Sequence, residues 1–174
     1  ENDWVTVTAI VSSPHNDYGF FISDASGPGA GIWVYDSGNY KDAIAMGDEI
    51  TITAELYEYS DLTELDVSDK KKGSLKVIGT ADVPAATVVT TKELADKKTA
   101  ESYESVLITV ENVTVTNPDL GYGEWSIDND VRVDDLFYEM STEKGATYSS
   151  ITGQLYYSYG DFKIVPHDAS SIVE

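Results

Sequence analysis

The segment Glu49–Leu65 reads EITITAELYEYSDLTEL and decides the fold. Within it, Glu49–Tyr59 alternates apolar and polar side chains and is rich in Ile, Thr and Tyr, which is typical of a long strand with one buried face. Ser60-Asp61 indicates a turn, and Leu62–Val67 predicts the returning strand. A long hairpin of this kind favours a β-sheet protein over a helical one.

Shorter segments on either side complete the plan of one small barrel. We expect three strands before the hairpin, a short helix over Ser37–Met46, and one strand after the hairpin at Leu75–Ile78. This order is that of a five-stranded Greek-key barrel of the OB type, whereas a seven-stranded sandwich needs more strands than this half provides. The three early strands are Trp4–Val11, Tyr18–Asp24 and Gly31–Tyr35.

The second half of the chain repeats this plan at a spacing of about 100 residues, which indicates a duplicated domain. Asp135–Thr142 takes the place of the first short helix, and a capping box at Thr90–Glu93 predicts another helix that runs to about Ala95. The aligned pairs are GFFISD with GEWSID (Gly19–Asp24 and Gly123–Asp128), Ile32–Tyr35 with Val131–Asp134, and ITAELY with ITGQLY (Ile52–Tyr57 and Ile151–Tyr156).

Val83–Thr87 contains Pro84 and has the character of a linker, so residues 1–82 and 83–174 are the two expected units. The expected fold class is all-β, with two tandem OB-like five-stranded Greek-key barrels and short connecting helices.

The composition limits the classes of function. Acidic residues outnumber basic ones by 31 to 11, and this net charge of −20 argues against a strongly basic nucleic-acid clamp. The absence of cysteine excludes disulfides, thiolate metal sites and a cysteine nucleophile. His15 and His167 are the only histidines, and ordinary surface positions are the simplest interpretation. No nucleophile elbow or metal triad is visible, so we do not expect an enzyme.

No apolar run is long enough to span a membrane, and the N-terminus lacks a basic-then-apolar secretion signal. The chain starts at Glu1, so we expect either a mature protein or a piece of a larger one.

Four segments together resemble the OB-fold modules of bacterial extracellular nucleases and related secreted or surface-anchored proteins: Gly19–Asp24, Gly31–Tyr35, Gly47–Leu65 and Ile151–Asp168. In that group a strand ending in Asp leads to a GI-x-V strand, then G-D opens the long strand and E-Y closes it. The resemblance implies a secreted or cell-surface bacterial protein whose module binds nucleic acid beside a separate catalytic domain. The acidity departs from that pattern, as does His167 where an arginine would be expected.

Aromatic side chains are the strongest candidates for a binding surface. Because successive strand residues face opposite ways, Trp33 and Tyr35 should point outward if Ile32 and Val34 fill the barrel. Exposed rings of this kind stack on bases or on sugar rings. The alternative is that they pack over the barrel ends or against the other barrel. Further aromatic candidates are Tyr57, Tyr59, Trp125, Tyr156, Tyr157, Tyr159 and Phe162, and the predicted ligand-binding set is Trp33, Tyr35, Tyr57, Tyr59, Trp125, Arg132 and Tyr157.

Charged residues give weaker signals. Arg132 aligns with Trp33 and would contact a phosphate or a carboxylate, or pair with a neighbouring Asp128, Asp130 or Asp134. Lys70–Lys72 with Lys76 form the only basic cluster, and a solvated turn is its simpler interpretation. No cofactor is expected, with calcium as the alternative, because two acidic sets offer oxygen ligands without the pattern of an EF-hand loop. These sets are Asp128, Asp130, Asp134 and Asp135, and Asp61, Glu64, Asp66 and Asp69.

The expected function is a non-catalytic extracellular binding module for single-stranded nucleic acid, which works beside a catalytic domain. The alternative is a structural or adhesive surface module that binds protein or polysaccharide.

Overall fold

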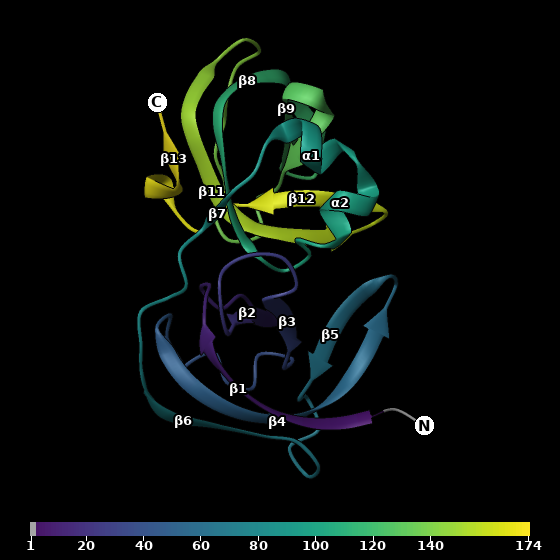
Figure 1. Ribbon diagram of the computed structural model, residues 1–174, viewed down its shortest axis with the longest axis vertical. Helices are drawn as coiled ribbons and strands as arrows, with labels where there is room; N and C mark the ends of the chain where they lie inside the picture. The colour runs from purple at the N-terminus through teal and green to yellow at the C-terminus, as the bar shows by residue number, and fades with distance from the viewer. Residues whose placement is uncertain (1–2) are drawn as a thin grey trace.

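A computed structural model describes residues 3–174 and shows two β-barrels, one above the other in Figure 1. Strands β1–β6 form a six-stranded sheet and strands β7–β13 form a seven-stranded sheet. Each sheet closes into a five-stranded barrel, so the expected all-β fold is confirmed. Within residues 3–174 the only α-helices are two short ones, and neither is long and apolar enough to cross a membrane.

Barrel 1 closes in the order β1-β2-β3-β5-β4-β1, which is the Greek-key order of an OB fold. Its neighbouring strands are antiparallel except β3 and β5, which run parallel. The long strand β4 pairs with β1 along one edge and with β5 and β6 along the other. The strands are β1 (Asp3–Val11), β2 (Gly19–Ser23), β3 (Gly31–Tyr35), β4 (Asp48–Tyr59), β5 (Leu62–Asp66) and β6 (Ser74–Thr80).

Barrel 2 closes in the equivalent order β8-β9-β10-β12-β11-β8, with β10 and β12 as its parallel pair. Two short strands, β7 and β13, extend its sheet at the edges. The duplication expected from the sequence is therefore present in the topology. The strands are β7 (Thr87–Val88), β8 (Leu107–Gly121), β9 (Glu124–Ile127), β10 (Val131–Val133), β11 (Thr147–Ser158), β12 (Asp161–Val165) and β13 (Ile172–Val173).

The expected helix at Ser37–Met46 does not form, and the segment is a series of turns. Buried Asp36 explains the difference, since its carboxylate accepts hydrogen bonds from the amides of Gly38 and Tyr40. Ser37 and Gly38 also take positive φ angles of 56° and 75°, which a right-handed helix cannot contain.

The expected helix at Asp135–Thr142 is likewise absent, because the apolar residues of this segment pack against two different clusters. Phe137 packs between the barrels, whereas Met140 packs against the core of barrel 2. The helix predicted from the capping box is confirmed as α1 (Thr91–Ala95), and α2 (Lys97–Glu101) follows it. Two single-turn 3-10 helices, η1 (Asp128–Asp130) and η2 (Ala169–Ser171), complete the elements.

The two barrels touch through backbone as well as side chains. A Cβ atom added to Gly31 would lie 2.1 Å from the carbonyl oxygen of Ser105, so barrel 1 approaches barrel 2 more closely here than any side chain would permit. The amide of Gly29 donates to the carbonyl of Ser102 at 2.8 Å. These contacts set the position of one barrel on the other.

Candidate ligand-binding cleft

The outer faces on which OB folds bind ligands lie against each other in this protein. An apolar cluster joins them, with Phe21, Trp33 and Leu62 from barrel 1 and Val165 from barrel 2. The ring centroids of Trp33 and Tyr156 are 5.5 Å apart across this junction. Part of each face is therefore buried between the barrels, and the remainder borders a cleft.

The prediction that Trp33 is an exposed ligand-stacking residue is wrong. Trp33 does point out of barrel 1, as the alternation of side chains predicts, since its neighbour Val34 packs in the barrel core. However, barrel 2 covers this outer face, and only 3% of Trp33 remains exposed. Its indole packs on Phe21 with ring centroids 4.7 Å apart. Trp33 therefore holds the barrels together and forms part of the cleft floor.

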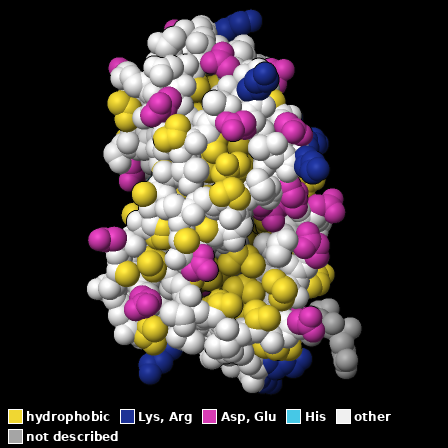
Figure 2. All heavy atoms as spheres, in the orientation of Figure 1, with side chains coloured by type: hydrophobic (Ala, Val, Ile, Leu, Met, Phe, Trp, Pro, Cys, Tyr) yellow, Lys and Arg dark blue, Asp and Glu magenta, His cyan; other side chains and the backbone are white. Residues whose placement is uncertain are grey.

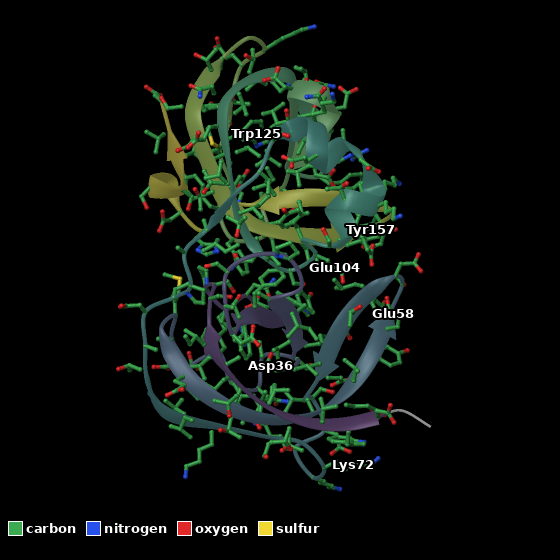
Figure 3. The ribbon with its side chains drawn as sticks, viewed as in Figure 1. Asp36, Glu58, Lys72, Glu104, Trp125 and Tyr157 are labelled. Carbon is green, nitrogen blue, oxygen red and sulfur yellow. The ribbon has the colours of Figure 1, made fainter. Side chains whose placement is uncertain are left out.

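Trp125 is also not a surface residue, because the GFFISD–GEWSID alignment is displaced by one position. Trp125 pairs with Val133 across the strands, just as Phe20 pairs with Val34. Trp125 is thus the counterpart of the core residue Phe20 and points into barrel 2, where 3% of it is exposed (Figure 3). A slip of one residue reverses the face of every strand side chain.

Beside the junction, three adjoining hollows of about 760, 570 and 450 Å³ form one cleft. Tyr159 lines all three hollows, and so does Tyr156 from the neighbouring strand. Tyr59 and Tyr159 are 60% and 99% exposed, so their rings are free to meet a ligand. We call this surface the tyrosine cleft, and it contains Tyr18, Tyr35, Tyr57, Tyr59, Tyr122, Tyr156, Tyr157 and Tyr159.

The cleft brings together six of the seven predicted site residues, all except Trp125: Trp33 in its floor, Tyr35, Tyr57, Tyr59, Arg132 and Tyr157. Tyr157 packs against the apolar cluster at the junction of the barrels (Figure 3). Sequence reasoning missed Tyr18 and Tyr122. Tyr122 is 97% exposed and stands between two glycines at a hairpin tip, a place where a large ring has no apolar partner of its own. An aromatic residue between two turn glycines is the sequence pattern that could have identified Tyr122 as a surface candidate.

The barrel 2 wall of the cleft carries a network of ion pairs. Arg132 does not pair with its neighbours in sequence but with Glu124 at 2.6 Å and Asp161 at 3.1 Å. Lys163, at the strand position beside Arg132, contacts Glu124 at 2.5 Å and Asp134 at 3.1 Å. Burial alone would lower the pKa of Lys163, but the hydrogen bonds that Lys163 donates to these two carboxylates, together with their negative charges, outweigh burial and raise it. Both cations in the cleft are therefore already neutralised.

The barrel 1 wall is acidic and has no such pairing. Glu64 and Asp66 of β5 line it, together with the rings of Tyr35 and Tyr57. Burial raises the pKa of Glu64 to about 7, and the nearby charges of Asp66 and Glu58 add to the shift. No lysine or arginine belongs to this wall.

Several members of the two acidic sets that could offer calcium ligands are engaged within the protein. Asp128 accepts a hydrogen bond from the amide of Thr114, and Asp66 accepts one from the amide of Ser68. Asp134 is paired with Lys163. Across residues 3–174 no group of three or more His, Asp or Glu side chains is arranged to hold a metal ion.

Neither histidine is the ordinary surface residue that was expected. The side chain of His15 is nearly buried, and its Nε2 lies 2.9 Å from the carboxylate of Asp36. His167 contacts the side-chain oxygen of Gln154, and burial lowers the pKa of His167 to about 4. Both rings thus have structural contacts, and neither lines the tyrosine cleft.

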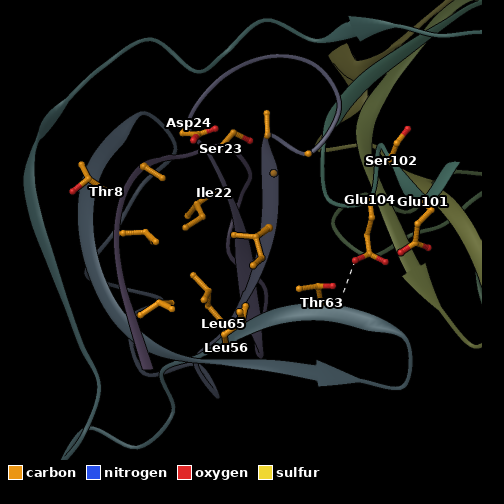
Figure 4. Close-up of a pocket in the computed structure, with 17 residues that line it drawn as sticks. Thr8, Ile22, Ser23, Asp24, Leu56, Thr63, Leu65, Glu101, Ser102 and Glu104 are labelled. Carbon is orange, nitrogen blue, oxygen red and sulfur yellow. Dashed lines mark hydrogen bonds between the residues drawn. The ribbon is translucent and has the colours of Figure 1, made fainter. Parts of the chain in front are cut away.

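Two other surface features, a hollow in barrel 1 and a basic turn, lie apart from the tyrosine cleft. A hollow of about 480 Å³ opens into barrel 1 and is lined by apolar side chains such as Val5, Ile22 and Leu65 (Figure 4). Hydrophobic side chains gather in this lower half of the face shown in Figure 2. At its rim Glu104 accepts a hydrogen bond from the amide of Thr63, but no tyrosine or tryptophan borders it. The basic turn marked by Lys72 lies at the end of barrel 1 away from barrel 2 (Figure 3).

No protein-family model matches the chain, and no curated protein matches it either.

Proposed function

We propose that this protein is a non-catalytic binding module that holds a polysaccharide chain in the tyrosine cleft. The observation that carries the proposal is the run of tyrosine rings across both barrels with carboxylates between them. Tyrosine offers an apolar ring face together with a hydroxyl group. Sugars present the same combination, because the apolar face of the ring packs on an aromatic side chain while its hydroxyls donate to carboxylates.

The charges of the cleft favour a sugar over a nucleic acid. Binding of a nucleic acid depends on cations that neutralise phosphates. Arg132 and Lys163, the cations of the cleft, are held by Glu124, Asp134 and Asp161. The whole chain carries a net charge of −20, which repels a polyanion at long range.

The resemblance to the OB-fold modules of bacterial extracellular nucleases supports a location outside the cell and a neighbouring catalytic domain. We propose a secreted or cell-surface protein whose binding module works beside a catalytic domain. A tandem of two barrels suits that role because its extended cleft holds a polymer without acting on it.

Calorimetric titration with glucose hexamers of different linkage tests this function. The expected result is binding that weakens at least about fivefold in Tyr57→Ala and Tyr59→Ala, since each stacked ring contributes on the order of 1–3 kcal/mol. Trp4→Ala is the matched control, because Trp4 is an exposed aromatic residue on β1 that does not line the cleft. Trp33→Ala is unsuitable as a probe since it would disturb the junction of the barrels.

Labelled single-stranded oligonucleotides provide the competing measurement, at low and high salt. Salt-sensitive binding of the oligonucleotide that is lost in Tyr57→Ala, with no response to any hexamer, would overturn the polysaccharide proposal in favour of nucleic acid.

A further inference from the structure

Glu64 occupies an unusual position on the barrel 1 wall of the cleft. It lies on β5, opposite Trp33 of β3 on one side and opposite Tyr57 of β4 on the other. Its neighbour Leu65 points into the barrel core, so Glu64 points out toward the cleft. Only 6% of the residue is exposed. An acidic side chain is thus placed at the floor of an aromatic hollow.

Within residues 3–174, the carboxylate of Glu64 has no ion-pair partner and accepts no hydrogen bond from the protein, and its oxygens are open to the cleft. Burying an unpaired charge is costly, and proteins ordinarily supply a partner. Lys163 holds the equivalent position in barrel 2, since it lies opposite Tyr156 just as Glu64 lies opposite Tyr57. The charge of Lys163 is compensated there by ion pairs with two carboxylates. Among residues 3–174, Glu64 has no counterpart to these ion pairs.

The surroundings of Glu64 indicate the chemical nature of that partner. Aromatic faces attract organic cations, and several tyrosines enclose the hollow above the carboxylate. The rings of Tyr57 and Tyr59 stand 6.4 Å apart at its rim. Asp66 and Glu58 add negative charge nearby and help to raise the pKa of Glu64, a shift that a bound cation would reverse. A metal ion would need more oxygen ligands than this wall gathers.

The hollow has a volume of about 570 Å³, within the range of roughly 300–1,000 Å³ found for small-molecule sites. It is continuous with the rest of the tyrosine cleft through Tyr156 and Tyr159. A cation bound here would therefore belong to the same ligand that occupies the cleft.

We propose that the hollow over Glu64 is a subsite for the ammonium group of an amino sugar, so that the bound polysaccharide contains unacetylated amino-sugar units. This inference rests on the proposed polysaccharide function and specifies the class of sugar. Glu64 forms the ion pair with the ammonium group, and the rings of Tyr57 and Tyr59 contact the sugar beside it.

Three hexamers with the same β-1,4 backbone test the inference by calorimetry at neutral pH: glucose, glucosamine and N-acetylglucosamine. They differ only at the C2 substituent. We expect the glucosamine hexamer to bind at least about tenfold more tightly than the other two, and Glu64→Gln to abolish that preference. Tyr57→Ala should weaken all three hexamers together and keep their order, which separates the role of the ring from that of the charge.

Glu111→Gln is the matched control, since it removes one exposed carboxylate on β8 away from the cleft. It should retain the preference for the amine. Equal binding of all three hexamers would overturn the inference and leave the polysaccharide function standing, whereas no binding by any glycan would overturn the polysaccharide function as well. A preference that survives in Glu64→Gln would mean general attraction to an acidic protein, and would also overturn the inference. Circular dichroism of each variant verifies that it is folded.

Discussion

Gln154 of β11 donates a hydrogen bond from Nε2 to the main-chain carbonyl oxygen of Ser12, 2.8 Å away, and both residues are fully buried. They lie 142 positions apart and belong to different barrels. This bond satisfies a carbonyl that the junction of the barrels hides from water.

Gln154→Ala removes that donor and leaves the carbonyl of Ser12 unsatisfied. We expect a loss of about 1–3 kcal/mol in the free energy of unfolding. Urea denaturation followed by tryptophan fluorescence measures it, since Trp33 lies in the same junction. Glu55→Ala is the control, because Glu55 holds the equivalent position on β4 and should change stability far less. Equal losses in the two variants would contradict the role given to Gln154.

Gly31→Ala tests the backbone contact between the barrels. The new methyl group would lie 2.1 Å from the carbonyl oxygen of Ser105, so the barrels must separate to accept it. We expect a destabilisation of about 1–3 kcal/mol and a drop in the melting temperature. Gly79→Ala on β6 serves as the comparison, since its methyl group would meet only the flexible end of Glu49. If Gly31→Ala melts like the wild type, the barrels do not touch there in solution.

His167 makes stability depend on pH in the acidic range. Burial lowers its pKa from 6.5 to about 4, so the unfolded chain binds the proton more readily than the folded protein. The stabilising contribution is complete above about pH 6.5 and is lost as the pH falls toward about 4, with a magnitude of up to about 3 kcal/mol. Chemical denaturation at several pH values measures the slope, which should flatten in His167→Asn. An unchanged slope in that variant would assign the acid sensitivity to other groups.

Glu64 should make the stability of the folded protein fall, rather than rise, as the pH increases. Its pKa is raised from 4.5 to about 7, so its burial as a charged group costs free energy once the pH passes through that range. We expect Glu64→Gln to be more stable than the wild type by about 1–2 kcal/mol near pH 8, where water in the cleft screens part of the cost, and to lose that advantage near pH 4.5. Thermal unfolding at both pH values checks the sign. Greater stability of the wild type near pH 8 would show that the carboxylate already has a partner.

Much of the fold follows from local patterns in the sequence. The alternation in Glu49–Tyr59 predicts β4 to within a residue, and the repeated ITAELY and ITGQLY segments reveal the duplication. Gly31–Tyr35 coincides with β3. These features depend on short-range periodicity, which a single sequence displays directly.

The sequence-based predictions fail at positions whose environment is determined by contacts with residues far away in the chain. The outward direction of Trp33 was predictable, but the barrel that covers it comes from residues more than a hundred positions later. The alignment of Gly19 with Gly123 matches Trp125 to Phe21, whereas its structural counterpart is Phe20. This shift of one residue turns a core position into a predicted surface position. The helix after β3 failed because the carboxylate of Asp36 competes for its amides. Glu64 was recognised only as one acid among many, since nothing local shows that it is buried.

The close approach at Gly31 has a consequence for how this protein could diversify. The walls of the tyrosine cleft belong to two separate barrels, so the spacing between them depends on the geometry of the joint rather than on the length of any loop. Small changes in the packing at Gly31 and Ser105 would tilt one barrel on the other and open or narrow the whole passage at once. A duplicated gene could thereby adjust which chains fit without altering a single tyrosine.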